Sequence, residues 1–131
     1  MKIETIDIIG EGFVNCHSCY MDRQHPLFGS KSIVKNLIKN GIKESKMNIL
    51  PDDVRLLFRI NEERFNRPLS DMGNEIFKAM AAIGFCYGKQ VFCFPWLSKM
   101  RFTSYHQNLT DLLDILTKLD KIVILPISKM E

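Results

Sequence analysis

A strand–helix–strand pattern in the last third of the chain restricts the fold more than any other feature. Two short apolar runs, residues 90–94 (QVFCF) and 121–127 (KIVILPI), are typical of buried strands. Between them Asn108 with Asp111 suits a helix start, and leucines then recur at helical spacing: Leu109, Leu112, Leu113, Leu116 and Leu119. Strands separated by helices favour an α/β fold with an open, mainly parallel sheet and flanking helices, flavodoxin-like or Rossmann-like.

The N-terminal segment adds a predicted strand and a long predicted loop. Residues 3–9 (IETIDII) are rich in β-branched side chains and favour a strand that ends at Gly10. Residues 10–30 are then expected to form a loop. A loop of about 20 residues without secondary structure is unusual inside a compact domain and is often functional.

A helix is expected after this loop. Ser30 suits its cap, with Lys31 as the first helical residue, and Gly41 suits the left-handed position after its end. Its apolar stripe consists of Ile33, Val34, Leu37 and Ile38.

The segment from 47 to 65 is harder to assign. A short strand is expected at 47–50. Pro51 with Asp52 and Asp53 is typical of a helix first turn, whereas VRLLFRI at 54–60 is equally typical of a buried strand. Both interpretations of 51–65 stay open at the level of sequence.

Residues 71–87 are predicted as a helix that ends at Gly88 and is capped by Asp71 or Asn74. Its buried face contains Ile76, Ala79, Met80, Ala82 and Ile83. Pro95 is expected to close the next strand, and residues 96–107 are expected to be irregular. Ligands of open α/β sheets bind at the carboxyl ends of the strands. Three loops are expected to meet there: 10–30, 66–75 and 95–107.

Length and composition indicate a single α/β domain over residues 1–131. Hydrophobic residues make up 46% and charged residues 25%, as in ordinary globular proteins. The chain contains no stretch of about 18 consecutive apolar residues, so no membrane span is predicted. Glu4 and Asp7 interrupt the apolar N-terminus, which also lacks a small-residue cleavage site and so does not resemble a signal peptide. The sequence therefore predicts a cytoplasmic protein with reduced cysteines and no membrane partner.

The charge pattern bears on the partner. The net charge is +3, and most of the chain mixes both signs. We find no run of Lys and Arg and no basic stripe with interleaved aromatic residues, which argues against nucleic acid as the main partner. A small anionic ligand stays open.

The stretch NCHSCYMDRQ (15–24) places Cys16 and Cys19 at C-x-x-C spacing. A thioredoxin-like redox pair is one interpretation, although such a pair needs a helix N-terminus beside it, and the next predicted helix begins well downstream. A second interpretation is a zinc set: Cys16, His17, Cys19 and either Cys86 or Cys93. The last two suit small core residues better. We expect reduced, metal-free loop cysteines that help to position Asp22 and Arg23.

Residues 70–94 (SDMGNEIFKAMAAIGFCYGKQVFCF) carry a more specific pattern. An Asp is followed by a Gly two residues later, a Glu on a small-residue helix, a Gly-Lys pair and an apolar strand. The matching residues are Asp71, Gly73, Glu75, Ala79, Ala82, Gly88, Lys89 and Val91. This stretch resembles the central motif of the nucleoside 2-deoxyribosyltransferase and nucleotide N-glycosidase superfamily. The opening is similar too: an apolar strand, Gly10-Glu11-Gly12-Phe13, and Asp22-Arg23-Gln24 ahead of the first helix.

The resemblance implies binding of a nucleoside or nucleotide, with cleavage or transfer at the N-glycosidic bond and with no metal or other cofactor. Glu75 would be the catalytic carboxylate at the sugar C1′, where positive charge develops, and Asp71 its catalytic partner. The substrate-binding residues implied are Gly10, Gly12, Phe13, Asp22, Arg23, Gln24, Gly73 and Asn74. The family also assembles as homo-oligomers with shared sites.

One departure from the family keeps other functions open. The family's catalytic Glu usually stands eight residues before the Gly-Lys pair, and Met80 occupies that position here. Glu75 and Asp71 would also suit a helix start without catalysis. The chain is therefore an enzyme that uses Glu75, a non-catalytic nucleotide-binding or interaction module on the same fold, or a thiol oxidoreductase that uses Cys16 and Cys19.

The 71–87 helix also bears on assembly. Phe77, Ala81 and Phe85 place apolar or small side chains on more than one of its faces. Because an exposed apolar patch on a small domain commonly marks an interface, a homodimer or larger assembly is expected.

Overall fold

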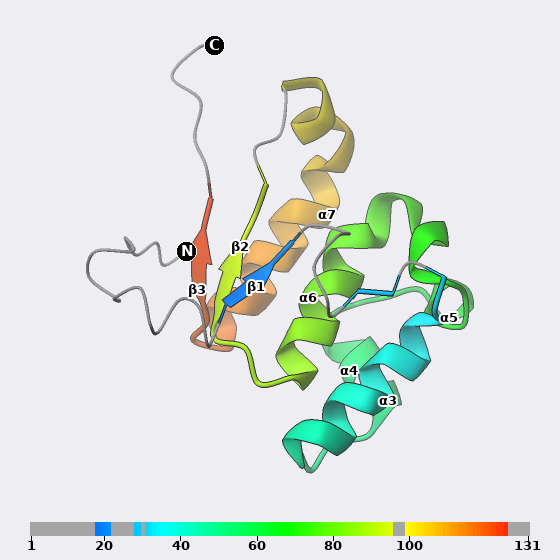
Figure 1. The fold of residues 1–131 in the computed structure, drawn as a ribbon. Coiled ribbons are helices and arrows are strands. Elements are labelled where there is room, and N and C mark those ends of the chain that lie inside the picture. The colour runs from blue at the N-terminus through cyan, green and yellow to red at the C-terminus, as the bar shows by residue number, and fades with distance from the viewer. Residues whose placement is uncertain (1–17, 22–27, 30, 96–98, 126–131) are drawn as a thin grey trace.

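The computed structural model describes residues 18–21, 28–29, 31–95 and 99–125, where helices are combined with a small parallel sheet (Figure 1). The strands are β1 (Ser18–Tyr20), β2 (Val91–Cys93) and β3 (Ile122–Ile124). The helices are α3 (Val34–Ser45), α4 (Pro51–Leu57), α5 (Glu62–Phe65), α6 (Ile76–Cys86) and α7 (Lys99–Lys118), with 3-10 turns η1 (Leu69–Asp71) and η2 (Gly73–Glu75) before α6. The predicted α/β class is confirmed.

The three described strands lie in the order β1-β2-β3, and both pairs are parallel. Parallel neighbours need long crossovers, which α3 to α6 and then α7 supply. Cys19, Phe92 and Val123 are register partners across the sheet, so their side chains share one face, and all three are fully buried. Helices α6 and α7 pack against each other beside this face (Figure 1).

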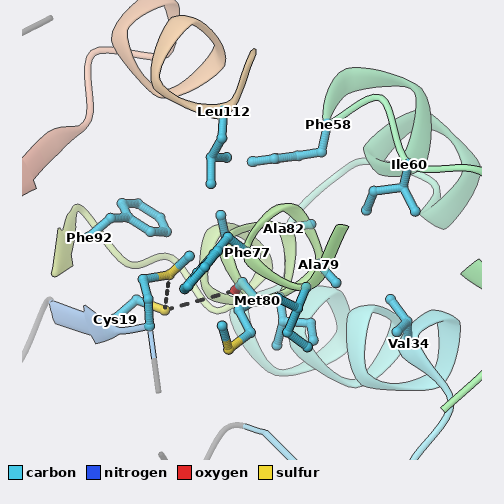
Figure 2. Packing of buried hydrophobic residues seen from close by; sticks show 14 of the residues in the cluster. Cys19, Val34, Phe58, Ile60, Phe77, Ala79, Met80, Ala82, Phe92 and Leu112 are labelled. Carbon is cyan, nitrogen blue, oxygen red and sulfur yellow. Dashed lines mark hydrogen bonds between the residues drawn. The ribbon is translucent and has the colours of Figure 1, made fainter. Parts of the chain in front are cut away.

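Helix α6 is the centre of the core. Nearly all of its residues are buried, including Ala79, Met80 and Ala82, because β1, β2, α3 and α7 surround it (Figure 2). A helix that is hydrophobic all round is stable only when it is covered on every side. Phe77 and Ala81 are buried as well. Their interpretation as an exposed patch is wrong, and it gives no support to the predicted homo-oligomer, which stays a prediction.

The first crossover differs from the sequence prediction at both of its ends. Residues 18–20 form a strand inside the segment that was expected to be a loop. Parallel pairing with β2 stabilises this strand. Helix α3 begins at Val34 rather than Lys31, and Ile33, which was expected in its apolar stripe, precedes the helix and is 37% exposed. Gly41 lies inside α3 and faces α6, where a Cβ would stand 2.9 Å from Cys86 Cβ. The left-handed position belongs to Lys46, with φ 58°.

The segment after α3 resolves the two interpretations left open. Residues 47–50 form no strand, so that prediction was wrong. Pro51 begins α4, with Asp52 and Asp53 in the first turn, as the helix interpretation required. A buried strand is excluded because the short helix buries Val54 while leaving Leu56 62% exposed.

Two helix starts were also misplaced. Helix α6 begins at Ile76 after two 3-10 turns, and neither Asp71 nor Asn74 caps it with a side chain. Helix α7 begins at Lys99, so residues 99–107 are helical rather than irregular. Tyr105 lies one turn before Leu109 on the inner face and extends the leucine stripe backwards. The strands predicted at 90–94 and 121–127 are confirmed as β2 and β3, and the strand predicted at 3–9 lies outside the described residues.

Candidate functional site

The N-terminal end of α6 lies at the carboxyl end of β2. Phe77, in the first turn of α6, packs against Phe94 directly after β2, with ring centroids 5.8 Å apart. Phe77 also meets the ring edge of Tyr105 on α7 at 5.4 Å. Turns η1 and η2 immediately precede α6, so the predicted 66–75 loop reaches the edge of the sheet where α/β folds bind ligands.

Glu75 is half-buried at the end of η2 and has a structural partner. Its Oε1 accepts a hydrogen bond of 3.0 Å from the backbone N–H of Asn61. Asn61 is the N-cap of α5, and its side-chain Oδ1 accepts from the N–H groups of Glu63 and Arg64. Glu75 thus completes the cap of a short helix from a distant position in the sequence, which is the hydrogen bonding that a helix start requires.

Asp71 has a different environment. Its side chain is 62% exposed at the end of η1, and one oxygen lies 3.9 Å from Nη1 of Arg67. Arg67 also pairs with Glu63. The two carboxylates proposed from sequence therefore have different partners, Asn61 for Glu75 and Arg67 for Asp71.

Gly73 is required by the backbone of this turn. Its φ is +56°, and a Cβ there would stand 3.1 Å from Nη1 of Arg64. The same Nη1 donates a 2.6 Å hydrogen bond to the Met72 carbonyl. An L side chain at 73 would be strained and would crowd this guanidinium. Asn74, the next residue, is exposed.

Six of the substrate-binding residues implied by the resemblance lie outside the described residues: Gly10, Gly12, Phe13, Asp22, Arg23 and Gln24. Cys16 and His17 lie outside them as well. The structure therefore describes four residues of the predicted site, and all of them lie in the two turns before α6. Asp71 is in η1, and Gly73, Asn74 and Glu75 are in η2.

Cys19 is a core residue rather than a loop residue. It lies in β1 with no exposed surface, and its Sγ makes weak contacts of 3.9 Å with the Met80 carbonyl and the Met21 sulfur (Figure 2). Burial raises the pKa of the Cys19 thiol to about 12, with Lys89 acting in the opposite direction. A thioredoxin-like pair sits at a helix N-terminus, whereas Cys19 sits in a strand.

The other cysteines and Met80 also belong to the packing. Cys86 is fully buried, as expected for a core residue, and burial raises its pKa to about 12. Cys93 is half-buried in β2. Met80, at the position where the family usually has its acid, is only 2% exposed. Among the described residues, no group of three or more His, Cys, Asp or Glu side chains is arranged to hold a metal ion.

The sequence analysis did not single out Lys78. Its side chain is 5% exposed inside α6, and its Nζ lies 3.4 Å from Asp111 Oδ2 on α7 and 3.5 Å from the Arg59 carbonyl. Asp111 also pairs with the Arg59 guanidinium at 3.5 Å. A lysine in an otherwise apolar helix signals a buried partner, although only the tertiary structure shows that the partner is on α7.

No helix in the described part of the chain is long and apolar enough to cross a membrane. Comparisons with known proteins give no relative: no family model, no curated protein and no solved structure matches the chain. Any functional assignment must therefore rest on the residues and geometry of this chain.

Proposed function

We propose that the protein binds a nucleoside or nucleotide at the carboxyl edge of its parallel sheet and does not cleave it. The observation that carries this proposal is the hydrogen bond between Glu75 and the backbone N–H of Asn61. The carboxylate that would have to stand free beneath the sugar C1′ is committed to capping α5. The carboxyl edge of the sheet stays available for a ligand, whereas the carboxylate that the family would use as nucleophile has a structural task.

Two observations support the location of the binding site. The N-terminal end of α6 meets the carboxyl end of β2 through the contact between Phe77 and Phe94. Backbone amides at a helix start suit a ligand that carries oxygen atoms. The ligand class rests on the resemblance of residues 70–94 to the deoxyribosyltransferase motif.

The finer fold assignment belongs to the same proposal. We infer an open sheet of the flavodoxin-like or Rossmann-like kind, with both faces covered. Val91 points to the face opposite its neighbour Phe92, and both are fully buried. A parallel strand that is buried on both faces is expected where helices or other chain segments cover the two sides.

Two residues argue for binding over catalysis. Met80 places an apolar, buried side chain at the position where the family usually has its acid. Asp71 is mostly exposed to water, where a carboxylate stabilises developing positive charge only weakly. Neither residue can replace Glu75 as the carboxylate beneath C1′.

Cleavage or transfer at the N-glycosidic bond is the second candidate. It is favoured by the half-buried position of Glu75 at this edge and by its second oxygen, Oε2, which makes no hydrogen bond to another residue of the described chain. In this candidate Oε2 faces C1′ while Oε1 holds α5 in place. Homo-oligomers with shared sites, as in the family that the sequence resembles, would belong to this candidate.

The test combines thermal melts with product analysis. The protein is incubated with a panel of nucleosides and nucleoside monophosphates, and each mixture is melted and also chromatographed for released base. A ligand present at about 100 times its Kd should stabilise the folded state by about 2.7 kcal/mol. Stabilisation without base release supports the binding module, whereas base release that is lost in Glu75→Gln supports the enzyme. No stabilisation and no release on any ligand would reject both.

A pair of variants locates the site. Asn74→Ala removes an exposed amide at the proposed edge, and Asn48→Ala removes an exposed amide in the connection before α4. Both should melt like the unliganded wild type, since neither side chain is buried. Only Asn74→Ala should reduce the shift that the ligand produces. Equal shifts in the two variants would move the ligand away from η2.

A further inference from the structure

Helix α3 and the residues beside its two ends carry lysines at a spacing of three to four residues, called here the lysine stripe: Lys35, Lys39 and Lys43 in the helix, Lys31 before it and Lys46 at its C-cap. Lys35 is half-buried, and the other four are exposed. At about 100° and 1.5 Å per residue, a step of four residues advances about 6 Å along a helix and turns by about 40°. Lys35, Lys39 and Lys43 therefore follow one side of α3.

The opposite side of α3 is in the core. Its buried residues, Val34, Leu37, Ile38 and Gly41, face the rest of the protein. Figure 1 shows α3 on the side of α6 that is away from the sheet. The lysine stripe is therefore remote from the sheet and lies on the outside of the helical layer.

The stripe has no ionic partner in the described part of the chain. On two other helical segments the same four-residue spacing joins a cation to an acid, since Arg67 pairs with Glu63 and Lys118 with Asp114. On α3 the same spacing joins lysine to lysine. Glu44, the one acidic residue of α3, is turned about 100° away from Lys43.

This pattern works against the stability of the helix. Like charges four residues apart destabilise a helix, and the first turn of α3 contains no acidic residue. If acids and lysines alternated at this four-residue spacing, the surface of α3 would be just as polar as it is now, and the helix would be more stable. Lys43 lies in the last turn and is favourable with the helix dipole, but the like-charge pairs Lys35–Lys39 and Lys39–Lys43 do not help folding, and an external anion would explain them.

We propose that the lysine stripe docks onto the phosphate backbone of a nucleic acid duplex, without reading its sequence. A regular row of ammonium groups complements a regular row of phosphates. Asn36 and Asn40 are exposed beside the lysines and add amide donors for phosphate oxygens. This function is separate from ligand binding at η2 and does not depend on it.

Two other anionic partners fit less well. Membrane-surface helices insert an apolar face, and the apolar face of α3 is already buried against the protein. Proteins that hold single strands stack bases on aromatic side chains, and α3 contains none. The chain has no run of consecutive Lys and Arg and no basic stripe with interleaved aromatic residues, but a contact with the duplex backbone alone needs neither.

The test is fluorescence anisotropy with a labelled DNA duplex of about 20 base pairs, at 50 and 200 mM salt. If four lysines contact phosphates, the salt slope is about −3.6, so the affinity falls about 150-fold over this range. The triple variant Lys35→Gln, Lys39→Gln, Lys43→Gln should reduce the slope to about −0.9. A duplex of scrambled sequence should bind with the same affinity.

A second triple variant is the matched control: Arg59→Gln, Arg67→Gln and Lys118→Gln. Both triple variants take the formal net charge from +3 to zero, and the control also removes the ion pairs of its three cations, so thermal melts of both variants accompany the binding assay. The control should keep most of the salt slope. Thermal melts should show the stripe variant at or above the stability of the wild type, because it loses like-charge repulsion.

Several outcomes would overturn the proposal. These are no duplex binding at 50 mM salt, equal losses in the two triple variants, or tighter binding to a single strand or to anionic lipid vesicles than to the duplex. If the stripe variant folds poorly, the single variants Lys39→Gln and Lys43→Gln replace it, each expected to lower the slope by about 0.9. An unchanged slope in both would equally reject the stripe as the contact.

Discussion

Replacing Gly84 with alanine should destabilise the protein, although alanine is the better helix former. Gly84 lies inside α6 where β1 packs against it, and a Cβ there would stand 2.5 Å from Cys19 Sγ and 2.9 Å from Cys19 Cβ. The ring of Phe92 is 3.2 Å away on the same side. Cys19 is fully buried and held by strand pairing, so it has no free space to move into.

The sign of the effect follows from two opposing terms. Glycine to alanine in a helix gains about 1 kcal/mol from helix propensity. An extra methyl group in a close-packed core costs about 1–3 kcal/mol, and contacts this short with the buried Cys19 side chain belong at the upper end. We expect a net loss of about 1–2 kcal/mol in the free energy of unfolding, or roughly 3–10 °C in the melting temperature.

Urea denaturation followed by circular dichroism measures this loss, and a double-mutant cycle locates its cause. Cys19→Ala removes the sulfur that the new methyl group would meet, so Gly84→Ala should cost less in that background, with a coupling of about 0.5–2 kcal/mol. A Gly84→Ala protein as stable as the wild type would refute the close packing of β1 on α6. Strict additivity of the two changes would show that the strain arises elsewhere.

Three further perturbations test single interactions. Glu75→Ala should lower the free energy of unfolding, measured by chemical denaturation, by about 1 kcal/mol, because the Asn61 N–H loses its acceptor. Glu75→Gln keeps an oxygen at that position and should lower it less. Equal losses in the two variants would contradict the capping role. Asp111→Asn should lower the free energy of unfolding by about 3 kcal/mol, because it leaves the Lys78 ammonium buried without its carboxylate partner. Lys78→Met removes the buried charge and should lower it far less. The reverse order of the two losses would be evidence against the buried pair. The pKa of Cys86 rises from 9.0 to about 12 in the folded state, so its contribution to stability is complete below pH 9 and is lost as the pH rises toward 12. The fall in stability of the reduced protein above pH 9 should therefore be shallower in Cys86→Ala, by about 1.4 kcal/mol per pH unit, and identical slopes would refute the shift.

Short-range patterns in the sequence predicted the best-determined elements. The apolar runs gave β2 and β3, and the small and apolar residues of 71–87 gave α6, because strand and helix periodicities are local properties. Pro51 with two following acids correctly indicated the start of α4.

The wrong predictions share a physical reason. Local signals placed helix starts at Ser30 and Asn108, but packing against neighbouring elements moved them to Val34 and Lys99. β1 could not be predicted from its own residues, since pairing with β2 and burial of Cys19 stabilise it. Tertiary contacts routinely override such weak local preferences.

By itself, the sequence determined the α/β class and most of the apolar face of α3, α6 and α7, since each depends on neighbours along the chain. Only the tertiary structure decided the tasks of Glu75, Gly84 and Lys78. Glu75 accepts a hydrogen bond from Asn61, Gly84 admits Cys19, and Lys78 meets Asp111. Each partner belongs to another element, so no periodicity predicts it, and the meaning of the side chain follows from which elements the fold brings together.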